Sequence, residues 1–163
     1  MLRIKMYQAG NGDAFLINTD TTNILIDGGY ASSFTQHIVD DLKELGTKNQ
    51  SLELVITTHI DSDHIGGIVK LLGLNGSSSQ PSIIPIGNIW HNSLRSLTAT
   101  PTKPLDLEKN RSLLQSINDR GHPKIKSDID SNAEKISAKQ GSTLATLIHN
   151  GGYRWRSEEH TSE

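Results

Sequence analysis

The decisive stretch of this sequence is Leu52-Glu53-Leu54-Val55-Ile56-Thr57-Thr58-His59-Ile60-Asp61-Ser62-Asp63-His64-Ile65-Gly66-Gly67. An apolar run ends abruptly in two histidines and two aspartates, and paired glycines follow. The four potential metal ligands are His59, Asp61, Asp63 and His64. Such groups repel or desolvate one another when packed together, unless a cation or protons compensate. The stretch therefore predicts a site for a divalent metal ion.

The four residues lie between an expected strand and an expected helix. Spacing at positions i and i+2 in a loop lets two side chains converge on one ion. The adjacent Asp63 and His64 point differently and could serve a second ion, or one ion each. The alternative is that one aspartate caps the helix and the histidines are surface residues. Capping explains one aspartate but neither histidine, so we favour the metal site.

The rest of the chain alternates between strand and helix patterns. The expected strands cover residues 2–7, 14–17, 23–26, 52–57 and 83–90. The expected helices cover residues 34–45, 65–72 and 106–120, with a last helix from Ser137 or Ser142 through Ile148. We expect flexible or irregular loops at 73–82 and 122–136. This order predicts an α/β fold with the histidine cluster beyond the carboxyl end of a strand, where such sheets bind ligands.

Composition narrows the classes of partner. The chain has 163 residues, a formal net charge of −2 and no cysteine. The charge gives no support for nonspecific nucleic-acid binding, and any metal must be held by histidine and carboxylates. The charged, alternating N-terminus is unlike a signal peptide, and no apolar run has the length of a membrane span. We expect a cytoplasmic location.

The C-terminal residues 156–163, Arg-Ser-Glu-Glu-His-Thr-Ser-Glu, look like the translation of a common sequencing-library adapter. An ordinary polar tail is the alternative. We therefore expect a partial domain at 1–155 and a non-native tail at 156–163. His160 is excluded as a ligand on this interpretation.

The segment Thr58–Gly67 resembles the central His-x-His-x-Asp-His motif of the metallo-β-lactamase superfamily, with Asp61 in place of the second histidine. This variant is similar to the soluble domain of the competence DNA-uptake channel family. Gly12-Asp13-Ala14 and the run from Ile24 to Gly29 resemble the opening hairpins of the same fold. The resemblance covers residues 2–72.

The resemblance implies an αββα metallo-β-lactamase-like sandwich, of which this chain holds the N-terminal half. It implies that His59 and Asp61 bind one ion, that Asp63 and His64 bind the other, and that Asp63 also orients the attacking hydroxide. One or two Zn²⁺ ions are expected, with Mn²⁺ tolerated. The family's later ligands, a histidine, a bridging aspartate and a final histidine, have no clear counterpart here.

Two functions from different classes remain open. The first is a hydrolase in which a metal-bound hydroxide attacks a phosphodiester or related ester, in a small molecule or a nucleic acid, with this fragment inactive alone. The second is a catalytically incomplete metal-binding or interaction module. Hydrolysis of β-lactams is a third and weaker candidate. Because half a sandwich exposes apolar sheet surface, we also expect poor solubility.

Several other residues have competing interpretations. Asp27 follows a strand and is equally suited to making a turn and to supporting a metal ligand. For His91, a surface position at a strand end is favoured over a role as third histidine ligand. The remaining candidates are expected to be ordinary turn, surface or packing residues: Asp13, His37, His122, His149, Trp90 and Trp155.

Overall fold

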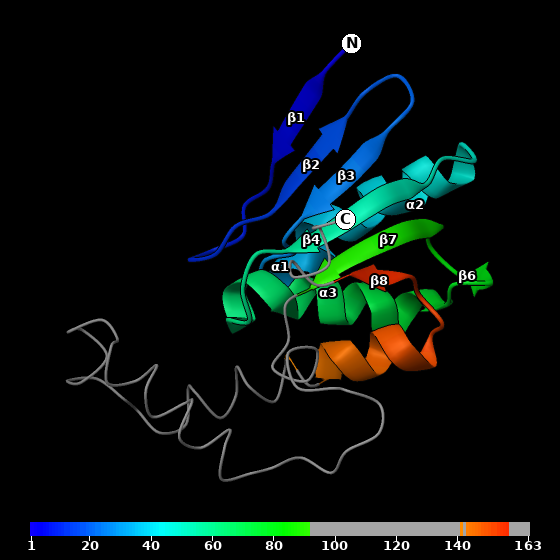
Figure 1. Ribbon diagram of the computed structural model, residues 1–163. Helices are drawn as coiled ribbons and strands as arrows, with labels where there is room; N and C mark the ends of the chain where they lie inside the picture. The colour runs from blue at the N-terminus through cyan, green and yellow to red at the C-terminus, as the bar shows by residue number, and fades with distance from the viewer. Residues whose placement is uncertain (92–140, 142, 157–163) are drawn as a thin grey trace, which may run out of the picture.

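The computed structural model describes residues 1–91, 141 and 143–156 (Figure 1). Its main sheet has six strands in the order β1-β2-β3-β4-β7-β8. Their bounds are β1 (Arg3–Met6), β2 (Phe15–Asn18), β3 (Asn23–Ile26), β4 (Leu52–Thr57), β7 (Ile86–His91) and β8 (Trp155–Arg156). The pairs β1–β2 and β2–β3 are antiparallel, whereas β3–β4, β4–β7 and β7–β8 are parallel. The carboxyl ends of β3, β4 and β7 therefore meet at one edge of the sheet.

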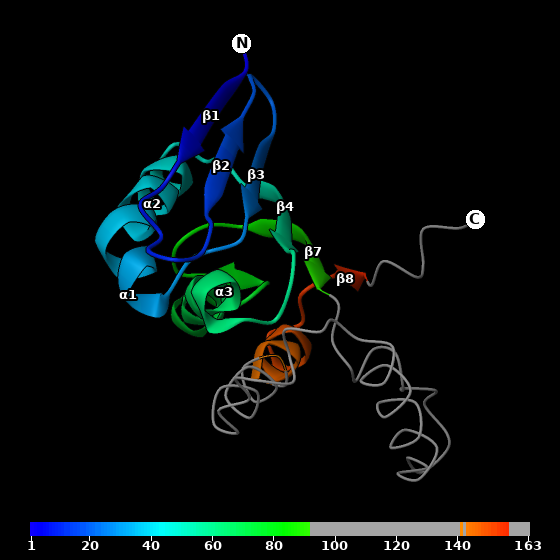
Figure 2. The ribbon, with the colours of Figure 1, turned by 90° about the vertical axis from the view of Figure 1, so that its left-hand side faces the viewer.

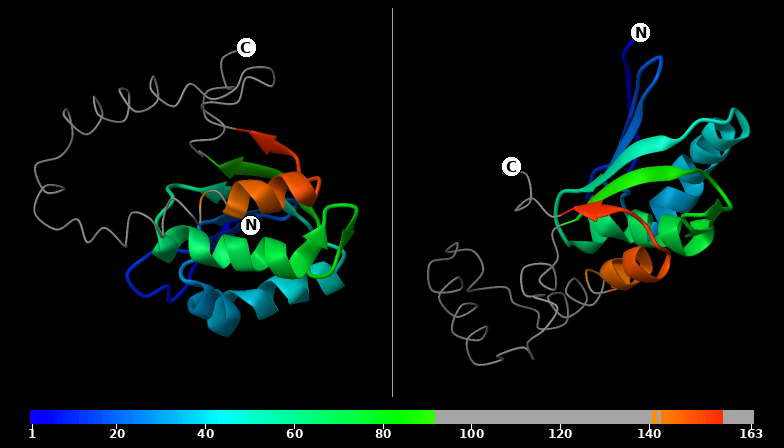
Figure 3. Two further views of the ribbon diagram at one scale, coloured as in Figure 1. Left: turned by 90° about the horizontal axis from the view of Figure 1, so that it is seen from below. Right: turned by 45° about the vertical axis from the view of Figure 1, so that its right-hand side comes forward.

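The helices lie on one side of this sheet (Figure 2). A helical stretch follows β3 and consists of α1 (Ala31–Ser33), the π-helical turn η1 (Phe34–Ile38) and α2 (Val39–Thr47). Helix α3 (Ser62–Asn75) connects β4 to the small ribbon of β5 (Gly76–Ser77) and β6 (Gln80–Pro81). Seen from below, α3 lies between α1–α2 and the helical residues 143–150 (Figure 3, left). None of the helices within the described residues is long and apolar enough to cross a bilayer.

The core forms where the inner face of the sheet meets the helices. Leu16, Leu25, Val55 and Ile89 are cross-strand neighbours in one row, and all are buried. Their helical partners in the same apolar cluster include Phe34, Ile38, Leu42, Ile65, Ile68 and Leu71, none of which is exposed. This is the alternation expected of a sheet with one face covered by helices.

The opposite face of the sheet is also apolar but is only partly buried. One cross-strand row on it is Phe15, Ile26, Ile56 and Trp90, and a second is Ile17, Ile24 and Leu54. Trp90 is 40% exposed. The described residues thus form one helix layer and one sheet layer, which confirms the expected α/β class and matches one half of an αββα sandwich.

Most predicted elements are confirmed, with shifts at their ends. The predicted strand 83–90 begins at Ile86, because Pro85 cannot donate to the ladder and instead accepts a hydrogen bond from the Leu52 amide. The predicted end of the second helix at residue 72, before Gly73, is wrong, since α3 continues to Asn75 and ends at Gly76, whose φ is +75°. The predicted loop 73–82 is correspondingly wrong, since it holds the end of α3 and the β5–β6 ribbon.

Several predictions lie wholly or largely outside the described residues. These are the helix 106–120, the loop 122–136, His122 and most of the tail 156–163. The last predicted helix is confirmed in its described part, where residues 143–150 are helical and Gly151 follows.

Candidate metal centre

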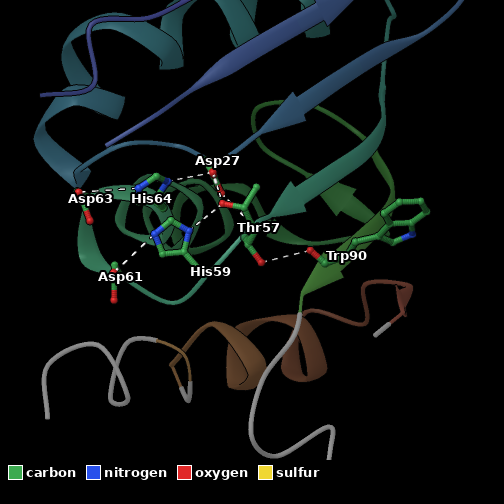
Figure 4. A network of polar contacts seen from close by, with 8 residues as sticks. Asp27, Thr57, His59, Asp61, Asp63, His64 and Trp90 are labelled. Atoms are coloured by element: carbon green, nitrogen blue, oxygen red, sulfur yellow. Dashed lines mark hydrogen bonds and ion pairs between the residues drawn. The ribbon is translucent and has the colours of Figure 1, made fainter. Parts of the chain in front are cut away.

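The histidine cluster lies at the edge of the sheet where β3 and β4 end (Figure 4). His59 and Asp61 belong to the loop that follows β4, and Asp63 and His64 belong to the first turn of α3. Asp61 is the residue that precedes this helix, but its side chain makes no capping hydrogen bond. Helix capping therefore does not account for its carboxylate.

Asp27 lies at the centre of the polar network. Its side chain is 2% exposed and its backbone φ is +54°, a left-handed conformation that few residues other than glycine adopt. Oδ1 accepts the Thr58 amide at 2.8 Å, and Oδ2 accepts the Thr58 hydroxyl at 2.6 Å. Oδ2 also lies 3.1 Å from Nδ1 of His64. Asp27 therefore connects the end of β3 to the cluster by hydrogen bonds.

The two histidine rings lie side by side, with centroids 3.7 Å apart and planes inclined by 47°. Nδ1 of His59 is 2.9 Å from the Thr58 hydroxyl. His64 is the more enclosed ring, with a side chain 12% exposed against 46% for His59. Because each Nδ1 is engaged in the network, each Nε2 is the nitrogen left to face a ligand.

A carboxylate oxygen lies near each Nε2. Oδ2 of Asp61 is 3.6 Å from Nε2 of His59, and Oδ2 of Asp63 is 3.9 Å from Nε2 of His64. Both distances exceed a hydrogen bond. They are close to the roughly 3.4 Å that separates two donors on one tetrahedral cation with bonds of about 2.1 Å. The donor set of two imidazoles and two carboxylates thus fits a divalent ion such as Zn²⁺ or Mn²⁺.

The structure groups the potential ligands differently from the two pairs implied by the resemblance. The atoms that come within 4.8 Å of one another belong to Asp27, His59 and His64. Both oxygens of Asp27 already accept hydrogen bonds from Thr58, so we interpret Asp27 as a residue that orients the histidines and not as a ligand.

Close backbone crossings hold the network in place. Gly67 N–H donates to Gly29 at 2.8 Å and Gly28 N–H donates to the His64 carbonyl at 2.8 Å. A Cβ at Gly12 would lie 1.8 Å from the carbonyl oxygen of Asp63, so the loop before β2 also packs directly on the start of α3. The Asp13 carbonyl accepts the Gly29 amide at 3.1 Å, which joins the loop before β2 to the segment after β3.

His91 is not the surface residue that we favoured from the sequence. It is 2% exposed, because it ends β7 on the face that the helices cover. Its Nδ1 lies 2.9 Å from the Thr57 hydroxyl, and its buried Nε2 has no hydrogen-bond partner among the described residues. Burial lowers the pKa of His91, and the Gly141 backbone opposes this only in part. His91 is not one of the residues whose ligand atoms come together.

The other candidates are placed as follows. His37 and His149 are exposed, on η1 and near the end of the helical residues 143–150. Trp155 donates from Nε1 to the His91 carbonyl at 2.9 Å and is 37% exposed. Trp90 lies on the open face of the sheet. Sequence reasoning missed Thr58, whose contacts depend on Asp27 of the neighbouring strand.

Comparison with known proteins confirms the resemblance. Residues 7–76 match the sequence profile of the metallo-beta-lactamase superfamily. This matched segment includes the whole cluster. Among solved structures, the chain is similar to the hydrolase AbOPH of the beta lactamase superfamily, with 18% identity and a TM-score of 0.38. The match covers 89% of this chain and 42% of that hydrolase, so the chain spans less than half of that protein's length.

Proposed function

We propose that this chain carries the N-terminal part of a metal-dependent hydrolase, with His59, Asp61, Asp63 and His64 as metal ligands. One observation carries the proposal: two adjacent imidazoles have Nδ1 engaged in the Asp27 network and Nε2 beside a carboxylate. When bound, a divalent cation lowers the pKa of water and polarises the bond to be hydrolysed. Zn²⁺ suits the imidazoles, and the carboxylates make Mn²⁺ an acceptable substitute.

We assign different roles to the residues of the cluster. His64 is the more rigid ligand, since it is largely buried and bonded directly to Asp27. Asp63, with a side chain 22% exposed, would be accessible both to a bound ion and to solvent. We assign to it the orientation of the attacking water, which it holds by accepting a hydrogen bond. The substrate class that we favour is a phosphodiester or related ester, on the basis of family resemblance and ligand hardness.

A second candidate function is a metal-binding module without turnover. The described cluster supplies only two imidazoles, and a catalytic zinc site keeps three protein ligands and an open position. If the carboxylates of Asp61 and Asp63 lie near the histidines without binding the ion themselves, the chain holds an ion weakly and does not hydrolyse esters.

The test is metal binding and turnover by the full 163-residue chain. Zn²⁺ and Mn²⁺ are titrated into the wild type, into a His59→Ala plus His64→Ala variant, and into His37→Ala, whose exposed histidine is not part of the cluster. We expect the double variant to lose binding and the control to retain it. Hydrolysis of a chromogenic phosphodiester by the metal-loaded wild type supports the enzyme. Binding without hydrolysis agrees with both functions, because the fragment is expected to be inactive alone. Equal metal content in all three proteins would refute both.

A further inference from the structure

We propose that Thr58 is a positioning residue that fixes the proton of His59 on Nδ1 and so directs Nε2 of this ring to the metal. The proposal rests on the metal-site function given above. The Thr58 hydroxyl lies 2.6 Å from Oδ2 of Asp27 and 2.9 Å from Nδ1 of His59. It is the atom that connects the buried carboxylate to the exposed ring.

The number of available protons decides the direction of these bonds. A hydroxyl has one proton to donate and two lone pairs, and an ionised carboxylate only accepts. The contact with Asp27 therefore uses the hydroxyl proton of Thr58. The same oxygen can then only accept from His59, so Nδ1 of His59 must carry a proton and Nε2 presents its lone pair.

His64 reaches the same tautomer by a shorter route. Its Nδ1 lies 3.1 Å from Oδ2 of Asp27, and this oxygen accepts a hydrogen bond directly from the Nδ1–H group. One carboxylate oxygen thus sets both imidazoles: it acts on His64 by contact and on His59 through Thr58. The Thr58 amide, which donates to Oδ1 at 2.8 Å, keeps the carboxylate in place even when the hydroxyl is removed.

The two histidines differ in how much they depend on this link. The side chain of His64 is enclosed, whereas that of His59 is 46% exposed, and the contact with Thr58 is the one described hydrogen bond to its ring. Loss of the hydroxyl frees the His59 ring to rotate or to move its proton to Nε2. Removing a group that orients a histidine ligand typically weakens metal binding about 10- to 100-fold.

The experiment compares Thr58→Val, which removes the hydroxyl at nearly constant shape, with Thr58→Ser, which keeps it. Zn²⁺ is titrated against a chromophoric chelator. We expect Thr58→Val to bind about 10- to 100-fold more weakly than the wild type and Thr58→Ser to bind within a few-fold of it. Far-UV circular dichroism checks that both variants fold. Equal affinity of Thr58→Val and wild type would overturn the proposal, as would an equal loss in both variants.

A second measurement keeps the inference separate from the proposed function. Nitrogen NMR of the imidazoles in the metal-free protein reports which nitrogen carries the proton. We expect His59 and His64 to be protonated on Nδ1 in the wild type and in Thr58→Ser, and only His59 to change in Thr58→Val. This pattern supports the role of Thr58 even if the wild type binds no Zn²⁺. A wild-type His59 protonated on Nε2 overturns it even if Zn²⁺ binds.

Discussion

A methyl group added at Gly67 should disrupt the contact between α3 and the segment after β3. In the wild type, a Cβ at this position would lie 2.0 Å from the carbonyl oxygen of Gly28 and 2.8 Å from its Cα. Both obstructing atoms are backbone, so no side chain can rotate out of the way. Real contacts of this kind are longer than 3.0 Å, and the two segments must therefore separate by at least 1.0 Å.

The size of the effect follows from the bonds that this separation breaks. The amides of Gly67 and Gly28 each donate across the crossing at 2.8 Å, and losing both bonds costs about 2 kcal/mol. Overpacking adds about 1–3 kcal/mol. Alanine gains about 1 kcal/mol over glycine in helix propensity. We therefore expect Gly67→Ala to lower the free energy of unfolding by about 2–4 kcal/mol.

The matched control lies on the same helix. Gly73 is exposed, and a Cβ there would have no atom within 4 Å, so Gly73→Ala should stabilise the protein by about 0.5–1 kcal/mol. Urea unfolding followed by far-UV circular dichroism measures both variants against the wild type. If Gly67→Ala proves as stable as Gly73→Ala, the close crossing is not a constraint and the reasoning fails.

Three further predictions concern other parts of the fold. Asn75→Ala should lower the free energy of unfolding by about 3 kcal/mol, because the buried amide bonds two backbone amides, a carbonyl and a tyrosine hydroxyl; urea unfolding measures this. Since burial lowers the pKa of His91, the folded state resists protonation, and stability should fall below a pH of about 6.5; a smaller acid loss in His91→Gln checks it. Leu54→Thr on the open face should reduce aggregation, measured by light scattering, and leave the fold intact, because it removes an apolar side chain from the partly exposed face of the sheet. Val55→Thr on the inner face should unfold the protein, because it buries an unpaired hydroxyl.

Within the described residues, local sequence patterns identified β1, β2, β3, β4, β7 and the helices, but not where several of these elements end, and not the short strands β5, β6 and β8. Alternation identified the inner positions Leu25 and Val55, because a strand exposes opposite faces in turn. The end of α3 was misplaced because Gly73 is exposed and needs no special backbone angle, so it stays helical. The true end depends on Asn75, whose side chain bonds the backbone of Ile83 and Ile84 across the following ribbon. Such a tertiary contact has no signal in the helix itself.

The candidate ligands were identifiable for a similar reason: His59 and His64 lie close together in the chain. The residues that orient them come from different strands. Asp27 meets Thr58 because β3 and β4 pair in parallel, and Thr57 meets His91 because β4 and β7 do. No spacing within the decisive stretch reveals either contact. The sequence did single out Asp27, because it is a polar residue directly after the neighbouring strand. It did not show that Thr58 would be its partner.

The conformation and burial of Asp27 cost stability that the rest of the fold must offset. A non-glycine residue in the left-handed region costs about 1 kcal/mol or more, and Asp27 is also a buried carboxylate. Three hydrogen-bond donors, two from Thr58 and one from His64, compensate for the burial. All of these partners lie in the part of the chain that matches the superfamily profile. On the proposed function, the orientation of both histidines would be determined within residues 27–64, so ligands supplied from elsewhere would complete the proposed metal centre without having to arrange this half of it.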